Sequence, residues 1–267
     1  MPRSSAAAWF FAALSLSACA QPFGRPPALR GVGIDQKLNA QVPLDLTFVD
    51  EFGNTVRLRD FFNGKPVILT PVYYQCPMLC NLVLNGLLSS MRQISLDLGK
   101  DFQVISVSFD PRETPLMAAR KKQSYIEKYG RDGAAAGWHF LTGHPPEIKA
   151  LTEAVGFHYQ WDPALQQWAH ASGIILLTPD GRVSRYFYGI NYEKHDLRLG
   201  LVDSSNRKIG TPVDQILLFC YHYDPTRGKY SFVIFNALRI GGAATAVLLG
   251  MFLFVSLRRE RKGARKA

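Results

Sequence analysis

A pair of cysteines at the junction between a strand and a helix constrains the fold of this 267-residue chain more than any other feature. The run Lys65–Tyr73 is apolar and rich in β-branched residues, which predicts a buried strand. It leads into the sequence Cys-Pro-Met-Leu-Cys at 76–80, after which apolar residues recur at helical spacing up to Leu98, just before Gly99. Both thiols are therefore expected on the first turn of the first core helix.

Strands and helices alternate along the rest of the domain. Further strands are expected at 102–109 and 138–141 and in hairpins at 44–58 and 174–188, and helices at 114–129 and 145–156. A strand–helix–strand–helix order followed by a hairpin is typical of an α/β protein with a mixed sheet flanked by helices. Because the cysteine motif lies where the first core strand meets its helix, the expected fold is thioredoxin-like.

The two cysteines are the first candidates for chemistry. Residues four apart lie one above the other on a helix, so Cys76 and Cys80 are neighbours, and the positive end of the helix dipole favours their thiolates. Two thiolates at that spacing form a redox-active disulfide or hold one soft metal ion. The alternative is that the two cysteines have no redox or metal role and form a structural disulfide or stay as inert buried thiols.

A histidine would complete a metal site. The chain has six histidines, at positions 139, 144, 158, 170, 195 and 222. His170 precedes the expected hairpin at 174–188, and in a thioredoxin-like fold the loop before that hairpin packs against the cysteine turn. The topology therefore predicts His170 as the histidine at the site.

Three further residues have open roles. Cys220 and His222 would share one face of a strand, where they serve as auxiliary ligands, as a docking thiol, or only in packing near a membrane. Asp110 ends a core strand and is expected either to orient the site or to cap a turn.

Three motifs in this order resemble the Sco/SenC family of copper proteins. They are Lys65–Cys80, then Val107–Pro115, which is similar to the family's S-x-D-P-x-x-D-T element, and His170 with Leu177–Gly181 downstream. The resemblance covers residues 40–200 and implies a thioredoxin-like fold that binds copper, as Cu(I) or Cu(II), through Cys76, Cys80 and His170. It also implies a role in assembling the binuclear copper centre of cytochrome c oxidase.

The N-terminal end has the pattern of an export signal. An apolar stretch from Ala6 to Ala18 is too short to span a membrane in the mature protein, so residues 1–20 are expected to be a signal peptide. Cleavage after small residues competes with a lipobox, in which Cys19 would carry a lipid. A linker at 21–39 follows, before the domain at 40–200 and a membrane-proximal extension at 201–231.

The C-terminal end predicts a membrane anchor. Ile240–Leu257 is uncharged and would give about 27 Å of helix, so a transmembrane helix is expected at 232–257. The tail at 258–267 is strongly basic, which by the positive-inside rule places it in the cytoplasm. This tail carries much of the net charge of +10, so the basicity does not require a nucleic-acid partner.

These features predict an exported copper chaperone, held in the cell inner membrane by a single helix with its domain on the periplasmic side. It would deliver copper to, or maintain the thiols of, the copper centre of cytochrome c oxidase, and its partner would be the oxidase subunit with that centre or another exported client. The family pattern often has Asp where Ala169 stands, and an N-terminal anchor. The alternative is an exported thiol–disulfide oxidoreductase, which needs Cys76 and Cys80 but not His170.

Overall fold

The computed structural model describes residues 31–210, 223–224, 229–230, 239–243, 245 and 247–252. The chain divides into two compact units, Met1–Ile209 and Gly210–Ala267, and each is treated by itself. The expected signal peptide with Cys19, the residues Cys220 and His222, and the basic tail lie outside the described residues.

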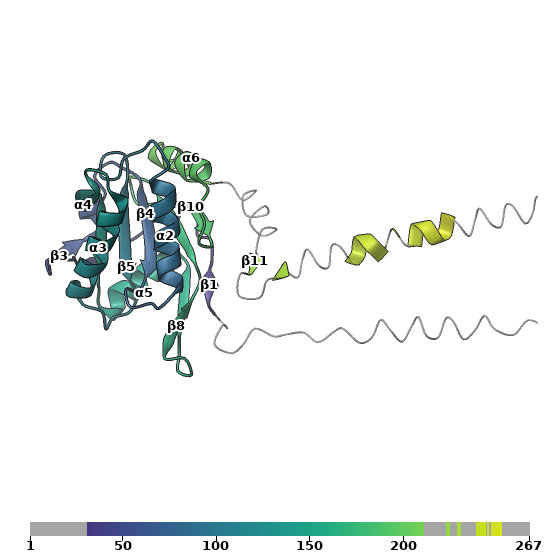
Figure 1. The fold of residues 1–267 in the computed structure, drawn as a ribbon, viewed down its shortest axis with the longest axis horizontal. Coiled ribbons are helices and arrows are strands. Elements are labelled where there is room, and N and C mark those ends of the chain that lie inside the picture. The colour runs from purple at the N-terminus through teal and green to yellow at the C-terminus, as the bar shows by residue number, and fades with distance from the viewer. Residues whose placement is uncertain are drawn as a thin grey trace, which may run out of the picture. The chain divides into compact units, whose positions relative to one another are not determined.

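A five-stranded mixed sheet forms the centre of the first unit (Figure 1). Its order is β10-β9-β4-β5-β6, where β4, β5 and β6 are parallel, while β9 is antiparallel to both β4 and β10. The strands are β4 (Val67–Val72), β5 (Gln103–Ser108), β6 (Trp138–Leu141), β9 (Gly173–Leu177) and β10 (Val183–Tyr188). The expected α/β fold with a mixed, thioredoxin-like sheet is confirmed.

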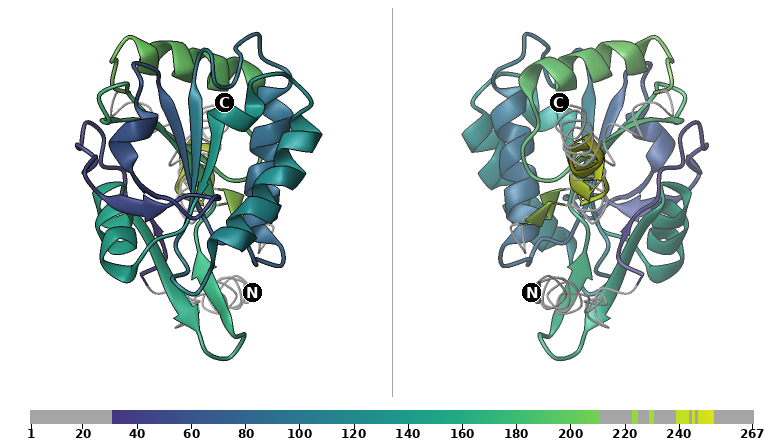
Figure 2. Two further views of the ribbon diagram at one scale, coloured as in Figure 1. Left: turned by 90° about the vertical axis from the view of Figure 1, so that its left-hand side faces the viewer. Right: turned by 90° about the vertical axis from the view of Figure 1, so that its right-hand side faces the viewer.

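Helices cover both faces of this sheet. Figure 2 shows α2 and α3 on one side of the sheet and α5 on the other. The helices are α2 (Leu79–Met91), α3 (Pro115–Tyr129), α4 (Ala134–Gly137), α5 (Pro145–Ala154), α6 (Lys194–Ser205) and the 3-10 turn η2 (Leu58–Phe61). Proline starts both α3 and α5, at a position where the missing amide donor costs nothing.

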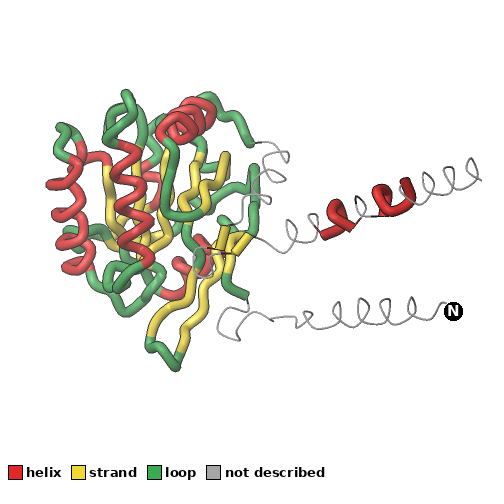
Figure 3. Tube along the Cα trace, turned by 45° about the vertical axis from the view of Figure 1, so that its right-hand side comes forward, coloured by secondary structure: helices red, strands yellow, loops and turns green. Residues whose placement is uncertain are grey.

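Two smaller sheets flank the main one. Strands β2 (Thr47–Val49) and β3 (Thr55–Arg57) form the first expected hairpin. A second sheet, β1-β7-β8, contains β1 (Gly33–Ile34), β7 (Phe157–Asp162) and β8 (Gln167–His170). Figure 3 shows β7 and β8 as a yellow arm that extends beyond the main sheet. His170 is thus the last residue of a strand, not part of a loop as expected.

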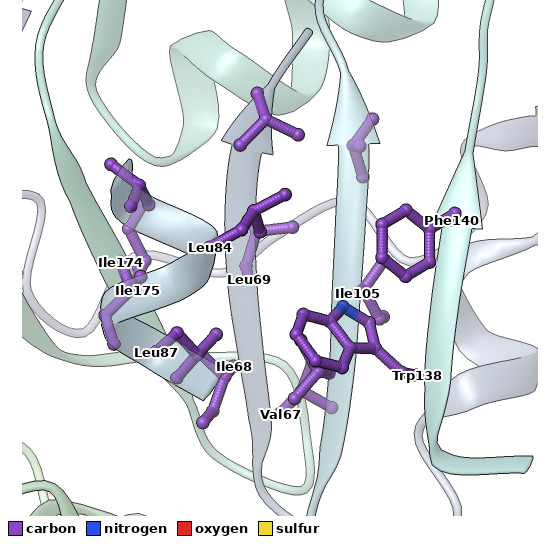
Figure 4. Close-up of a cluster of buried hydrophobic side chains, with 14 of the residues drawn as sticks. Val67, Ile68, Leu69, Leu84, Leu87, Ile105, Trp138, Phe140, Ile174 and Ile175 are labelled. Carbon is purple, nitrogen blue, oxygen red and sulfur yellow. The ribbon is translucent and has the colours of Figure 1, made fainter. Parts of the chain in front are cut away.

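The core lies between the sheet and its helices. Every residue of β4, β5 and β9 is buried, as expected for central strands covered on both faces. Figure 4 shows Leu84 and Leu87 of α2 over this sheet, with Ile68 of β4, Ile105 of β5 and Trp138 of β6 in the same buried cluster. This packing fixes the position of α2, and with it the position of Cys80.

Helix α2 is shorter at both ends than its apolar pattern predicts. It begins at Leu79, so Cys76 lies in the loop before it, and it ends at Met91 instead of Leu98. Beyond the end of the helix, the N–H of Asp97 donates to the Asp101 carboxylate at 2.7 Å and closes a local turn before β5. Ile94 and Leu98 lie after the end of α2 and are nevertheless buried. Their apolar spacing therefore indicates burial and not a continued helix.

The described part of the second unit is small. Strands β11 (Tyr223–Asp224) and β12 (Lys229–Tyr230) pair antiparallel. Residues 239–243, 245 and 247–252 are helical. Among the residues that the structure describes, no helix combines the length and the apolar character that crossing a bilayer requires.

Candidate metal centre

The two cysteines and His170 converge at one end of the main sheet. Cys76 lies in the loop between β4 and α2, Cys80 is the second residue of α2, and His170 closes β8. Their two Sγ atoms and a histidine ring nitrogen all lie within 4.8 Å of one another. Both cysteines are reduced and buried, and His170 is half-buried. The structure therefore brings together all three of the ligands that the sequence suggests.

Backbone amides orient the two sulfur atoms. The N–H of Cys80, in the first turn of α2, donates to Cys76 Sγ at 3.2 Å. The N–H of Tyr73, at the end of β4, donates to Cys80 Sγ at 3.3 Å. Cys76 precedes the helix, yet its sulfur accepts an amide at the helix start. The positive helix end thus acts on it much as expected.

His170 presents one ring nitrogen to the sulfurs. Its Nδ1–H donates to the carbonyl of Ala171 at 2.8 Å, and its Nε2 lies 3.3 Å from Cys80 Sγ. This assignment leaves the Nε2 lone pair available for a metal, with the opposite nitrogen held by a carbonyl as in many metal-bound histidines. The rings of Tyr73 and Phe109 contact the imidazole at centroid distances of 5.8 and 5.3 Å.

The two thiols differ in how readily they lose their protons. A hydrogen bond from the Cys80 thiol, with others from nearby backbone amides, lowers the pKa of Cys76 to about 3 against the opposing effect of burial. Burial and the neighbouring Cys76 raise the pKa of Cys80 well above its usual range. At neutral pH the site therefore holds a thiolate at Cys76 and a proton on Cys80, which a bound metal ion would displace.

A buried carboxylate that sequence reasoning missed fixes the loop before Cys76. Glu113 accepts the N–H of Tyr74 on one oxygen and the N–H of Gln75 on the other, each at 2.7 Å. The hydroxyl of Ser108 donates to the same carboxylate at 2.5 Å. Burial nevertheless raises the pKa of Glu113. The available signal was an acid inside the Val107–Pro115 motif, a few residues after the buried strand β5.

A second polar contact holds the other side of this loop. Lys121 of α3 donates to the carbonyl of Tyr74 at 2.9 Å and to the side chain of Asn81 at 2.6 Å. Asn81 in turn donates to the carbonyl of Cys76 at 3.0 Å. The loop that carries Cys76 is therefore tied to α3 from two directions.

Asp110 caps a turn, the second of the two roles expected for it. Its carboxylate accepts the backbone N–H of Arg112 at 3.0 Å and the guanidinium at 2.8 and 2.6 Å. Burial would raise the pKa of Asp110, but these hydrogen bonds lower it overall. The same guanidinium lies 4.5 Å from the ring centre of Trp161 on β7, so Asp110 also helps to hold the arm that ends in His170.

Other histidines in the described part of the chain lie elsewhere. His158 pairs with Asp35 at 3.0 Å, and His139 packs against Phe61 at a centroid distance of 4.3 Å. His195 is exposed on α6 beside Asp196. The choice of His170 from the topology is therefore consistent with the observed geometry.

We expect Glu113→Gln to lower the free energy of unfolding by about 1–3 kcal/mol, because the backbone N–H of Tyr74 or of Gln75 would lose its acceptor. The glutamine side chain keeps the shape of glutamate but has a single acceptor oxygen, so it cannot serve both Tyr74 and Gln75. Denaturant unfolding of the two proteins measures the effect. The control is Glu127→Gln on the exposed side of α3, which should change stability little; equal stabilities for all three proteins would contradict the role of Glu113.

The fold and the site together define a thioredoxin-like α/β protein with a Cys-Cys-His group suited to a metal ion. The model of the SCO1/SenC family matches residues 35–197. The chain therefore belongs to the SCO1/SenC family, as its motifs suggest.

Solved structures with a TM-score of at least 0.50 support the same fold. A putative electron transfer protein from Aquifex aeolicus VF5 is 29% identical, with a TM-score of 0.56, over 64% of this chain and 96% of that one. A SCO1/SenC family lipoprotein from Bacillus anthracis str. Ames is 19% identical, with a TM-score of 0.50, over 64% and 96%. ScoI of Arabidopsis thaliana, solved with copper bound, is 21% identical, with a TM-score of 0.49, over 61% and 96%. A search of curated proteins gives no match.

Proposed function

We propose that this protein is an exported copper chaperone that serves the copper centre of cytochrome c oxidase. The observation that carries the proposal is the convergence of Cys76 Sγ, Cys80 Sγ and a ring nitrogen of His170 within 4.8 Å. The cargo is copper, and Cys76, Cys80 and His170 are its ligands. The oxidase as client follows from membership of the SCO1/SenC family, and the subunit that carries the binuclear copper centre is the proposed partner.

The donor set suits copper better than zinc. Two thiolates favour Cu(I), and imidazole binds copper in either oxidation state. A structural zinc site would normally have four protein ligands, whereas the described residues bring three together here. A site with three ligands also leaves one side open, which suits an ion that is to be passed on.

The open question within this proposal is whether the protein gives copper or electrons to its client. The two free, buried thiols and the lowered pKa of Cys76 also suit thiol–disulfide exchange. An exported oxidoreductase that keeps client cysteines reduced is therefore the second candidate. Copper binding and disulfide formation exclude each other at this site, because both use the same sulfur atoms.

Anaerobic titration of the reduced full-length protein with Cu(I) tests the proposal directly. We expect one copper per chain, with two sulfur and one nitrogen neighbours counted by X-ray absorption. A chain that binds no copper but exchanges disulfides rapidly would favour the oxidoreductase.

We also propose that the chain is anchored in the inner membrane by residues 232–257, after export directed by residues 1–20. The uncharged run at Ile240–Leu257 and the basic residues after it support this arrangement. The domain would then work in an oxidising compartment, where a reduced thiol pair needs a redox or metal function.

A reporter that works only in the cytoplasm should be active when it is fused after Ala267, because the basic tail is expected to stay inside. A reporter that requires the periplasm, fused at the same place, is the control and should be inactive. The reverse pattern would place the C-terminus outside and contradict the proposed topology.

A further inference from the structure

One residue of the cysteine loop is apolar and yet faces solvent. Met78 lies midway between Cys76 and Cys80, and 66% of its surface is exposed. Both flanking cysteines are buried, with 5% and 0% exposed. Single exposed apolar side chains are common on protein surfaces, so exposure alone assigns no role to Met78. What sets Met78 apart is its place in the chain, two residues from each of the two buried cysteines.

The backbone of Met78 is hydrogen-bonded at the site, while most of its surface is exposed to solvent. The carbonyl of Met78 accepts the N–H of Leu82 at 3.1 Å in the first turn of α2, and the Met78 N–H is directed at Cys76 Sγ. Methionine has a long, unbranched side chain with three rotatable bonds and a polarisable sulfur. From this position the thioether can reach outward to solvent or turn back towards the Cys76 sulfur.

We infer that Met78 is a mobile soft ligand that captures Cu(I) at the surface and passes it to Cys76 and Cys80. The inference rests on the proposed copper function and adds a route for the cargo to a pair of thiols that solvent scarcely reaches. Thioether sulfur, like thiolate, selects Cu(I). His170 and the two cysteines supply three ligands, so the open side of the site is where a fourth, temporary ligand fits.

The transfer is an exchange of ligands without a change in oxidation state. A Cu(I)–ligand bond of the donor breaks as the bond to Met78 Sδ forms, and the thioether is neutral and releases no proton. The Cu–Sδ bond then breaks as bonds to Cys76 and Cys80 form, and the Cys80 thiol releases its proton to water. Copper stays Cu(I) throughout, so no oxidant or reductant is required.

The test is the rate at which the reduced full-length protein takes Cu(I) from a coloured Cu(I)–bicinchoninate complex. Met78→Leu keeps the size of the side chain and removes its sulfur, and Met78→Gln keeps its flexibility but offers only hard donors. We expect both variants to slow uptake by about tenfold, the effect of about 1.4 kcal/mol of lost transition-state binding. Because a temporary ligand speeds transfer in both directions, the equilibrium copper affinity should stay within about threefold of the original.

Two controls separate ligation by Met78 from a distorted loop. Met117→Leu makes the same substitution on the neighbouring helix α3 and should leave uptake unchanged. Reduction of the Cys76–Cys80 disulfide by dithiothreitol should proceed at the original rate in both Met78 variants, because it needs no thioether.

Unchanged uptake in Met78→Leu, or equal slowing of uptake and disulfide reduction, would overturn the inference and leave the copper site standing. An unaltered protein that takes up no copper would overturn the proposed function, and this inference with it.

Discussion

Replacement of both Cys76 and Cys80 by serine abolishes stoichiometric Cu(I) binding. The serine hydroxyl nearly matches the thiol in shape, but it is a hard donor that keeps its proton at neutral pH. The remaining imidazole of His170 cannot hold Cu(I) alone against competing ligands in solution. We expect the affinity to fall by about 10⁴-fold or more, equivalent to about 5.5 kcal/mol.

Anaerobic competition against bicinchoninate measures this loss in the double variant and in each single variant. Each single variant should lose tight binding, because one thiolate and one imidazole leave copper with two protein ligands. Cys220→Ser is the matched control for loss of a thiol, since Cys220 lies outside the domain matched by the family model. Stoichiometric copper in the Cys76→Ser/Cys80→Ser protein would show that the metal binds elsewhere.

The main sheet and the first two ligands could be predicted because strong local patterns specify them. Lys65–Tyr73 is largely apolar and contains β4, and the run at 138–141 coincides with β6. The end of α2 could not be predicted, because Ile94 and Leu98 keep the apolar spacing of a helix after the chain has turned. Burial sets that spacing without a helix.

The surroundings of His170 were harder to anticipate. Strand β7 has no fully alternating pattern of buried and exposed residues, because its arm packs against a neighbouring strand and not against a broad core. Glu113 was missed because acids after a strand are usually exposed turn residues, whereas here two amides and a hydroxyl compensate its burial. Such long-range compensation cannot be read from local sequence.

The orientation of the imidazole does not depend on the side chain of the residue before it, which is Ala169 in this chain. The Nδ1–H of His170 donates to the carbonyl of Ala171 at 2.8 Å. A backbone carbonyl fixes this tautomer without adding a negative charge, so Nε2 faces Cys80 Sγ.

His170→Ala should separate the two candidate functions. The imidazole supplies a copper ligand, whereas disulfide exchange needs only an attacking thiolate and a partner thiol. We therefore expect copper affinity to fall by about a hundredfold or more, since even residues that merely orient a ligand cost 10–100-fold when lost. The rate of disulfide exchange by Cys76 and Cys80 should change far less, because the amides of Cys80 and Tyr73 still orient both sulfurs.

Two measurements on the same variant decide between delivery of copper and reduction of thiols. The first is the copper content of cytochrome c oxidase in cells that carry only the His170→Ala form, and the second is the exchange rate of the purified protein. His158→Ala is the matched control, because His158 lies on the same small sheet but pairs with Asp35 instead of the thiols.

Copper-deficient oxidase with normal exchange would support delivery of copper, because the thiols still work. Normal oxidase copper together with normal exchange would contradict it and favour the oxidoreductase. If both activities are lost, His170→Gln is the variant to measure next. Glutamine keeps a polar side chain of similar size against Tyr73 and Phe109, so this variant separates loss of the ligand from damage to the fold.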